Sequence, residues 1–584
     1  MRPVILTVLI LLSTFGLLSE AWLAEDAAIT LRAVENLYHT MGPVFNPGEQ
    51  TEVYTHPLWF LILVIFRGFG LNSSITAVFL GAVLGLAGLL LLIRTPSRPE
   101  GDSTPFRYLH LLIPFLLAAH PGFRQFAASG MELGLLAFVL GLFYLMLEQN
   151  RPAERPGLLG FYLGLLYLIR PELGLFAVWY GFFFIWELLR QKHLNRLQLI
   201  GRAGRAAFAV LIVAGSWHLF RYLYYGELFP NTYYAKAGLD SYWIQGIKYL
   251  AHSIAFAPTA WILILLLLAY AYLTYYNAPT TEDPARRSTN WFRLVRDLGA
   301  PLLMIIYVMR LGGDFMAFRF LLPELIMMAW LARRLFTIPL PARWNGFLSR
   351  WDAHPSRVLA VFAIASIVAM FIPIPQSRGF IANERFHFVQ KFETKGPGLL
   401  QATNHPWGKR GQELSELQSC LNYRTFRIAN SQAEATCMEG MGLGYVGLSA
   451  GPYVHIIDEQ GISDAYVARL PILLRFRPGH EHSIGTLEVL AKDVLFCSTG
   501  DHRYDEIMST PYGTISRWDP ALLAMVPDIE QRLDKLKSHK QAGSPAIEML
   551  EERYGITVEE LIQRSALWND DRLVRRRNCW QEEG

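Results

Sequence analysis

Charged residues are scarce in this sequence. Asp, Glu, Lys and Arg make up 17% of the 584 residues, against 52% hydrophobic residues. Such a chain is too apolar for a soluble enzyme and too charged for a bare bundle of membrane helices. The net charge of +4 is small for this length and no long basic tract occurs, so nucleic-acid binding is excluded. Part of the chain is therefore expected in lipid and part in water.

Cysteine is also scarce, and all four cysteines lie in the last third of the chain. No C-x-x-C spacing suggests zinc or redox chemistry. Cys420 and Cys437 are seventeen residues apart, which is compatible with a disulfide in an oxidising compartment or with two buried thiols. The pair His480 and Glu481 has no second His at helical spacing. We therefore predict no metal and commit to no cofactor.

Apolar runs long enough to cross a bilayer, or nearly so, dominate residues 1–375. The first begins like a signal peptide but lacks an A-x-A-like cleavage site, so we expect it to be retained as a helix. About eleven transmembrane helices are predicted, at 3–23, 74–93, 108–120, 133–148, 157–169, 173–189, 206–222, 259–276, 298–310, 320–336 and 357–375.

The short apolar run 57–70 decides the orientation of these helices. If it lies at the membrane surface, nineteen Lys and Arg residues fall in one set of loops and eight in the opposite set. Basic loops prefer the cytoplasm. This predicts a cytoplasmic amino terminus, a transmembrane domain at 1–375, and a soluble domain at 376–584 on the outer side, which is the periplasm if the cell is Gram-negative.

The last third has the composition of an α/β domain. The segments LGYVGLSAGPYVHIID (443–458) and VLAKDVLFCST (489–499) have the β-branched and aromatic content of buried strands. Residues 520–540 and 544–565 are predicted to be helical.

The first outer loop, 24–57, carries the adjacent acids Glu25 and Asp26 where the first apolar run ends. A carboxylate pair at that depth is expensive to desolvate, which suggests a function, although the acids could merely mark the end of the helix in water. Residues 29–41 are predicted to form a short amphipathic helix. The loop then continues through Glu49, Tyr54 and His56.

Four further outer loops are short and dense in polar residues, and together the five loops predict one polar cavity on the outer side. Singly, each has an ordinary explanation, such as a snorkelling Arg, a helix end, an aromatic belt or a turn. The candidates for donor binding are Arg170, Glu172, Asp314 and Arg319, together with Asn231, Tyr233 and Lys236 of the loop at 221–238. The candidates for the acceptor side of a cleft are Glu132 and, in the first loop, Glu49, Tyr54 and His56. Asp464, His480 and Glu481 of the last third are candidates for the acceptor side of a cleft, or for residues that only tie a loop together.

An enzyme on the outer face has no cytoplasmic nucleotide donors, so a group transfer there needs a lipid-borne donor. A lipid phosphate leaves as an anion, and Arg suits bidentate phosphate binding. An attacking hydroxyl needs a carboxylate base within hydrogen-bond reach. Asp26 is the candidate base, with Glu25 beside it as a helper.

The motifs EDAAITLR, NPGEQTEVYTHPLW, RPELG, YYGELFPNTYYAK, GGDFMAFR, IIDEQGISDAYVARLP and PGHEH resemble one known family. It comprises the mycobacterial terminal β-(1→2)-arabinofuranosyltransferase of the cell wall and Gram-negative relatives, some labelled flagellar motor control protein. The resemblance implies a GT-C glycosyltransferase that moves a pentose, arabinofuranose by analogy, from a polyprenyl-phosphate donor with inversion. It assigns the base to the acid pair, although Glu25 departs from the usual Asp-Asp.

Two other function classes compete with this interpretation. A lipid-linked sugar flippase or transporter needs polar groups through the depth of the bilayer, whereas the ionisable residues here gather on one side. A non-enzymatic envelope or motility factor would make the acid pair dispensable. The expected partners are the bilayer, a polyprenyl-phosphate sugar and a glycan or pilin-like acceptor.

Overall fold

The computed structural model describes most of the first 464 residues of the chain. The described residues are 2–46, 49–94, 109–149, 152, 154–191, 194–236, 241–276, 284–338, 350, 354–372, 374, 377–378, 381–391, 400–416, 424–428, 442–452, 454–458, 460–464, 468 and 478.

The chain divides into two compact units, each built from separate segments. Unit 1 contains residues 1–24, 55–219 and 240–400, and unit 2 contains residues 25–54, 220–239 and 401–584. Residues 25–54 of the predicted first outer loop and the predicted outer loop at 221–238 therefore group with the last third of the chain. Residues 376–400, which we predicted to begin the soluble domain, group with the helical unit.

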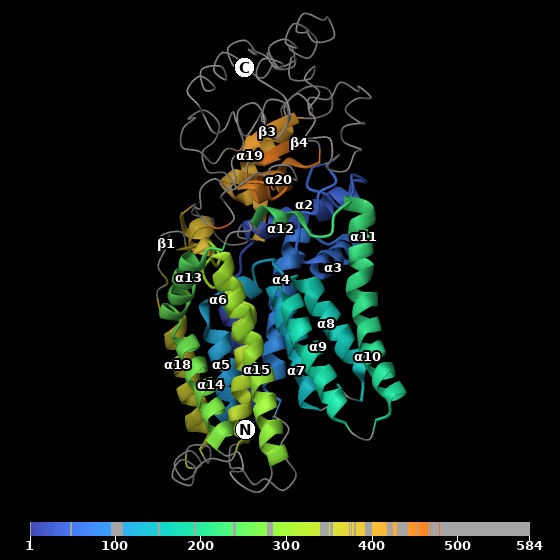
Figure 1. Ribbon diagram of the computed structural model, residues 1–584. Coiled ribbons are helices and arrows are strands. Elements are labelled where there is room, and N and C mark those ends of the chain that lie inside the picture. Colours follow the sequence, from blue (N-terminus) through green and yellow to red (C-terminus); the bar gives the residue numbers. More distant parts are fainter. Residues whose placement is uncertain are drawn as a thin grey trace, which may run out of the picture. The chain divides into compact units, whose positions relative to one another are not determined.

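Unit 1 is almost entirely helical, as its long apolar runs predict. Its helices run side by side as a bundle (Figure 1). They are α1 (Arg2–Ser19), α3 (Pro57–Gly68), α4 (Ser73–Leu92), η1 (Leu109–Leu111), α5 (Leu112–Ala119), α6 (Pro121–Ala127), α7 (Leu133–Glu148), α8 (Pro156–Ile169), α9 (Leu173–Arg190), α10 (Arg196–Val210), η2 (Leu211–Gly215), the start of α11 (Ser216–Tyr225), α13 (Trp243–Ala255), α14 (Pro258–Tyr276), α15 (Pro284–Leu311), η3 (Arg319–Leu321), α16 (Leu322–Ala332), η4 (Arg333–Thr337) and α18 (Pro355–Met370).

Among the described residues, four helical stretches are long and apolar enough to cross a membrane: Ser73–Leu92, Leu173–Arg190, Arg196–Tyr225 and Pro258–Tyr275. Six shorter helices are also apolar, among them α3 and α8. Each of the eleven predicted runs coincides with helix in the structure. The number of crossings and their orientation stay predictions.

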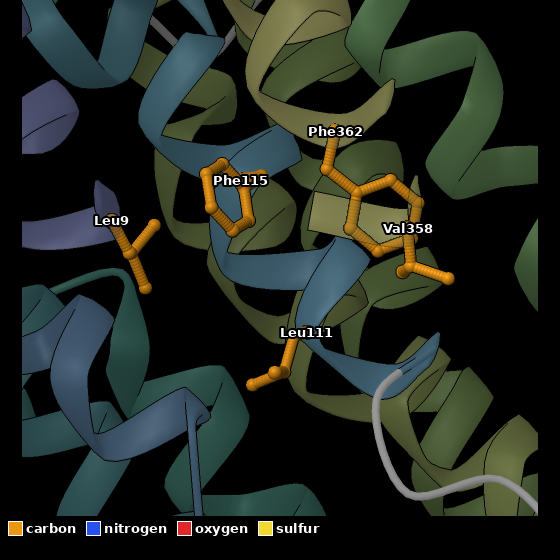
Figure 2. Packing of buried hydrophobic residues seen from close by; sticks show 5 residues of the cluster. All are labelled: Leu9, Leu111, Phe115, Val358 and Phe362. Carbon is orange, nitrogen blue, oxygen red and sulfur yellow. The ribbon is translucent and has the colours of Figure 1, made fainter. Parts of the chain in front are cut away.

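One part of the core of unit 1 joins helices from the two ends of its sequence. Leu9 of α1, Leu111 of η1, Phe115 of α5, and Val358 and Phe362 of α18 form a buried cluster (Figure 2). The rings of Phe115 and Phe362 lie 6.2 Å apart in a tilted arrangement. Apolar contacts of this kind hold the last helix of the bundle against the first.

Helix α13 has its apolar and polar faces reversed relative to a helix in a soluble protein. Gln245 and His252 are buried, whereas Ile244 is 71% and Ile247 56% exposed. A helix with this pattern directs its large apolar side chains toward lipid and its polar side chains toward the protein. We did not predict this helix from hydropathy, because its polar face interrupts the apolar run.

Unit 2 mixes helices and strands. It contains α2 (Glu25–Tyr38), the end of α11, α12 (Asn231–Lys236), η7 (Ala402–Asn404), α19 (Pro406–Glu416), β3 (Arg424–Ile428), α20 (Leu443–Ala450) and β4 (Val454–Asp458). Strands β3 and β4 pair in parallel, with Arg424 opposite Val454 and Ile428 opposite Asp458. Helix α20 lies between them in the chain, as in a β-α-β connection.

Two predictions for unit 2 can be compared with the described residues. The helix expected at 29–41 is confirmed as α2, which begins four residues earlier. The strand content expected over 443–458 is wrong for its first half, because residues 443–450 form α20 and only 454–458 form a strand. The predicted elements at 489–499, 520–540 and 544–565 lie outside the described residues.

Helices α4 and α7 approach each other closely at a glycine contact. A Cβ atom on Gly134 would lie 2.0 Å from the carbonyl oxygen of Gly81, which is backbone and has little room to move. We therefore predict that Gly134→Ala forces the two helices apart and destabilises the protein by about 1–3 kcal/mol. The measurement is the unfolding midpoint of the full chain in detergent.

Gly181 of α9 provides a matched control, because a Cβ atom there would meet no atom within 4 Å. Gly181→Ala should be neutral, or stabilising by up to about 1 kcal/mol, since alanine is the better helix former. Equal midpoints for the two variants would contradict the close contact of α4 with α7.

Candidate functional site

The two adjacent acids occupy the first turn of α2, in unit 2, and have different surroundings. Glu25 is buried, and its Oε1 accepts a hydrogen bond from the backbone N–H of Gly444, near the start of α20. Asp26 is half-buried. Successive residues of a helix point about 100° apart, so the two carboxylates face different ways. Glu25 is thus part of the contact between α2 and α20, and Asp26 is the more accessible acid.

Arg32, nearly two turns further along α2, binds three backbone carbonyl groups. Its Nε donates to Phe45 at 2.6 Å, Nη1 to Gly447 at 2.8 Å and Nη2 to Val454 at 2.6 Å. The guanidinium also lies 4.4 Å from the centroid of the Phe45 ring. This buried cation therefore joins α2 to the loop that follows it, to α20 and to β4.

The side chain of Asn46 extends the pairing at β4. It accepts a hydrogen bond from the N–H of Ile456 at 3.1 Å and donates to the carbonyl of the same residue at 2.9 Å. Its amide also donates to Glu49 Oε2 at 2.9 Å. Glu49, a predicted cleft residue, is buried and supports this contact.

Two residues of the predicted outer loop at 221–238 bind the end of the first loop. Arg221 and Glu52 form a buried ion pair through two contacts, and the hydroxyls of Tyr54 and Tyr225 lie 2.9 Å apart. Tyr225 also donates to the carbonyl of Pro43 at 2.8 Å. Burial, followed by the neighbouring Tyr225 and Glu52, raises the pKa of Tyr54 well above its ordinary value. Tyr54 is therefore a neutral hydrogen-bonding group in this contact.

Asn231 reaches the turn between Asp458 and Asp464. Its amide donates to the carbonyls of Gly461 at 2.8 Å and Ile462 at 3.0 Å. Inside the turn, Asp458 accepts hydrogen bonds from the N–H groups of Gln460 and Ser463, and burial raises the pKa of its carboxyl. Asp464 is also buried. These residues tie the turn to α12.

Tyr233 and Lys236 lie on the same short helix as Asn231. Tyr233 is exposed, and its ring stacks on that of Phe229 with centroids 4.5 Å apart. Lys236 is half-buried in the last turn. Their predicted role in donor binding stays a prediction.

The remaining candidates lie in unit 1, around two arginines. Arg170 Nη1 donates to Glu132 Oε1 at 2.9 Å, and its Nε pairs with Glu172. His56 Nδ1 lies 3.4 Å from Glu132 Oε2. Burial alone lowers the pKa of Arg170, but Glu172 and Glu132 outweigh burial and raise it above its ordinary value. The guanidinium therefore stays charged.

The second arginine belongs to the GGDFMAFR motif. Arg319 binds Asp314 through two contacts, of 2.5 and 2.9 Å. The guanidinium carbons of Arg319 and Arg170 lie 5.1 and 5.3 Å from the centroid of the Phe320 ring. We call Glu132, Arg170, Glu172, Asp314, Arg319 and Phe320 the two-arginine cluster.

A strained loop presents Arg319 to this cluster. Gly312 and Gly313 have φ values of +91° and +75°, and Phe318, directly before Arg319, has φ +71°. A left-handed phenylalanine costs on the order of 1 kcal/mol or more. Tyr249 of α13 holds the loop, since its hydroxyl donates to Met316 O at 3.0 Å and accepts from Phe320 N–H at 3.1 Å. The polar face of α13 thus fixes the motif.

The other predicted residues cannot be placed. His480, Glu481, Cys420 and Cys437 lie outside the described residues, so the disulfide and this part of the cleft stay predictions. Within the described part of the chain, no group of three or more His, Cys, Asp or Glu side chains is arranged to hold a metal ion.

The residues that assemble unit 2 were not predicted from the sequence. Arg32, Glu52, Arg221 and Tyr225 are all buried, but we did not select them. Glu52 and Arg221 are 169 residues apart, so their pairing has no local spacing to reveal it. The sequence indicated the importance of these residues only in that they occur in loops that already contain many candidate residues.

The fold and these clusters define a helical protein with candidate membrane spans and two groups of buried ionisable residues. No family model matches the chain.

Two curated relatives are similar in sequence. The chain is 31% identical over 343 residues to the terminal beta-(1->2)-arabinofuranosyltransferase of Mycobacterium tuberculosis, covering 55% of this chain and 53% of the relative. It is 25% identical over 341 residues to the protein of that name from Corynebacterium glutamicum, covering 52% and 46%. The predicted resemblance is therefore confirmed, and the chain spans about half the length of these relatives.

Among solved structures, ArnT from Cupriavidus metallidurans bound to undecaprenyl phosphate is similar with a TM-score of 0.47 and 11% identity. The match covers 79% of this chain and 86% of that one.

We predict that Arg32→Met destabilises unit 2 by at least about 3 kcal/mol, because three buried carbonyls lose a charged donor. The measurement is denaturant unfolding of the full chain, followed by limited proteolysis within residues 401–458. Arg410→Met is the control. Arg410 forms a partly exposed pair with Glu413 within α19, and such pairs contribute at most about 1 kcal/mol. Equal losses in the two variants would refute the proposed importance of Arg32.

Proposed function

We propose that this protein is an inverting glycosyltransferase that moves a pentose from a polyprenyl-phosphate donor to a glycan or protein acceptor. The similarity to two terminal arabinofuranosyltransferases supports the reaction class and makes arabinofuranose the candidate sugar. The observation that carries the mechanism is the unequal environment of the acid pair, with Glu25 bound to Gly444 and Asp26 half-buried beside it.

Asp26 is the proposed general base. Its place in the first turn of α2 favours the anionic carboxylate, because the helix dipole is positive at that end. An Asp26 carboxylate oxygen takes the proton of the acceptor hydroxyl, whose oxygen attacks the anomeric carbon. The bond from that carbon to the phosphate oxygen breaks, and polyprenyl phosphate leaves with the bonding electrons. Attack from the face opposite the phosphate inverts the anomeric centre.

The proposed phosphate-binding groups are Arg170 and Arg319. Both present planar guanidinium groups suited to phosphate oxygens. Each is already paired, Arg170 with Glu132 and Glu172 and Arg319 with Asp314. A bound phosphate therefore has to share each arginine with its carboxylate partner or replace that partner. In this proposal the carboxylates orient the arginines and do not bind the donor themselves.

The proposed setting is a bacterial inner membrane, with the amino terminus in the cytoplasm and residues after about 376 in the periplasm. It rests on the distribution of basic residues among the loops.

We predict that Asp26→Asn lowers transfer by about 10²–10⁴-fold, the usual contribution of a general base. Glu25→Gln should lower it by less than about tenfold, because glutamine can still accept the Gly444 hydrogen bond through Oε1. The assay uses membranes supplied with radiolabelled polyprenyl-phosphate arabinose, and the control is Glu413→Gln, at an exposed position of α19. Full transfer by Asp26→Asn would rule out Asp26 as the base.

The orientation gives a separate prediction. A reporter enzyme that is active only in the periplasm, fused after Gly584, should be active, and a cytoplasmic reporter at the same position should be silent. The opposite pattern would reverse the assignment of the basic loops to the cytoplasm.

A further inference from the structure

Glu324, in the first turn of α16, is a buried carboxylate that the proposed mechanism does not use. It is 1% exposed. Within the described residues, no other residue donates a hydrogen bond to either of its carboxylate oxygens. A buried polar group without a partner costs about 1–3 kcal/mol, and more if it is charged. A carboxylate kept in such a position points to a ligand that supplies the missing donors.

The surroundings of Glu324 belong to the two-arginine cluster of unit 1. The charged groups that act on Glu324 are Arg170 and Glu172, and Tyr249 lies close enough to be influenced by it. Phe320, whose ring contacts both arginines, lies four residues earlier, at the start of the same helical stretch. Glu324 thus adds a hydrogen-bond acceptor to a cluster whose arginines are already paired.

The charge of this cluster limits what Glu324 can bind. Four carboxylates, Glu132, Glu172, Asp314 and Glu324, accompany the guanidinium groups of Arg170 and Arg319. An anionic group is repelled by Glu324 and is held instead by the guanidinium groups of Arg170 and Arg319, whereas a cation beside Glu324 is repelled by Arg170. A neutral ligand with O–H donors satisfies both carboxylate oxygens without either penalty.

We propose that Glu324 binds the hydroxyl groups of the pentose carried by the lipid donor. This subsite rests on the proposed function and deepens it by naming the residue that distinguishes a glycosylated lipid phosphate from the bare lipid phosphate. Two hydroxyls of the sugar donate to the two oxygens of Glu324, while the paired arginines remain available to the phosphate.

The test measures binding of two probes to the full chain in lipid nanodiscs. One probe is polyprenyl-phosphoryl arabinofuranose, and the other is polyprenyl phosphate without the sugar. Glu324→Gln keeps the shape but replaces one acceptor oxygen with an NH₂ donor. Losing one hydrogen bond from a hydroxyl should weaken the sugar-bearing lipid about tenfold and leave the bare lipid phosphate unchanged.

Glu187→Gln is the matched control. Glu187 lies on α9 of the same unit, where it pairs with Arg296 at 2.9 Å, and it should leave the affinity for both probes unchanged. If Glu324→Gln does not fold, Glu324→Asp replaces it, because the shorter carboxylate moves both acceptors away from the sugar by about one methylene group and should weaken the same probe.

Each other outcome overturns the subsite. Equal weakening of both probes would assign Glu324 to the phosphate or to the fold. Unchanged affinities for both probes in both Glu324 variants would show that Glu324 does not take part in binding. A wild-type protein that binds the two probes equally has no sugar subsite, and one that binds neither contradicts the proposed function as well.

Discussion

The hydrogen bonds of Arg32 are the interaction on which unit 2 depends. A buried guanidinium group is stable only when its donors are satisfied, and here they meet carbonyls of Phe45, Gly447 and Val454. These acceptors come from the loop after α2, from α20 and from the start of β4, so one side chain sets the position of all three. The position of Glu25 follows, because the approach of α2 to α20 brings its carboxylate to the N–H of Gly444. Arg32 thus helps to fix the contact that buries Glu25, and Asp26, which points to another side of α2, is left half-buried.

The helices of unit 1 could be predicted from the sequence because burial in lipid requires long apolar runs, and each of those runs coincides with helix. The two-arginine cluster could be foreseen in part. Arg170 with Glu172, and Asp314 with Arg319, are close in sequence, and both pairs form in the structure. The packing of α13 could not be predicted, because its buried face is explained only by contacts with a loop distant in sequence, such as those of Tyr249 with Met316 and Phe320.

The assembly of unit 2 was harder to predict, for two physical reasons. Its main contacts join residues more than 150 positions apart, such as Glu52 with Arg221 and Asn46 with Ile456, and no local pattern marks them. The β-rich composition of 443–458 also concealed α20. Gly444 and Gly447 lower local helix propensity, but they lie one turn apart and give α2 and Arg32 room to approach. Tertiary contact therefore decided the secondary structure of this segment.

The division of unit 2 among three chain segments affects the order in which it can be made. Helix α2 is among the first elements to leave the ribosome, yet the carbonyls that satisfy Arg32 are synthesised more than 400 residues later. Until then the guanidinium of Arg32 has to remain hydrated or bound elsewhere. A fragment that starts after the last bundle helix would lack both α2 and the Arg221 segment, and would leave the acceptors of α20 and β4 unmatched. Unit 2 can therefore be completed only after the bundle helices between its three segments have been synthesised.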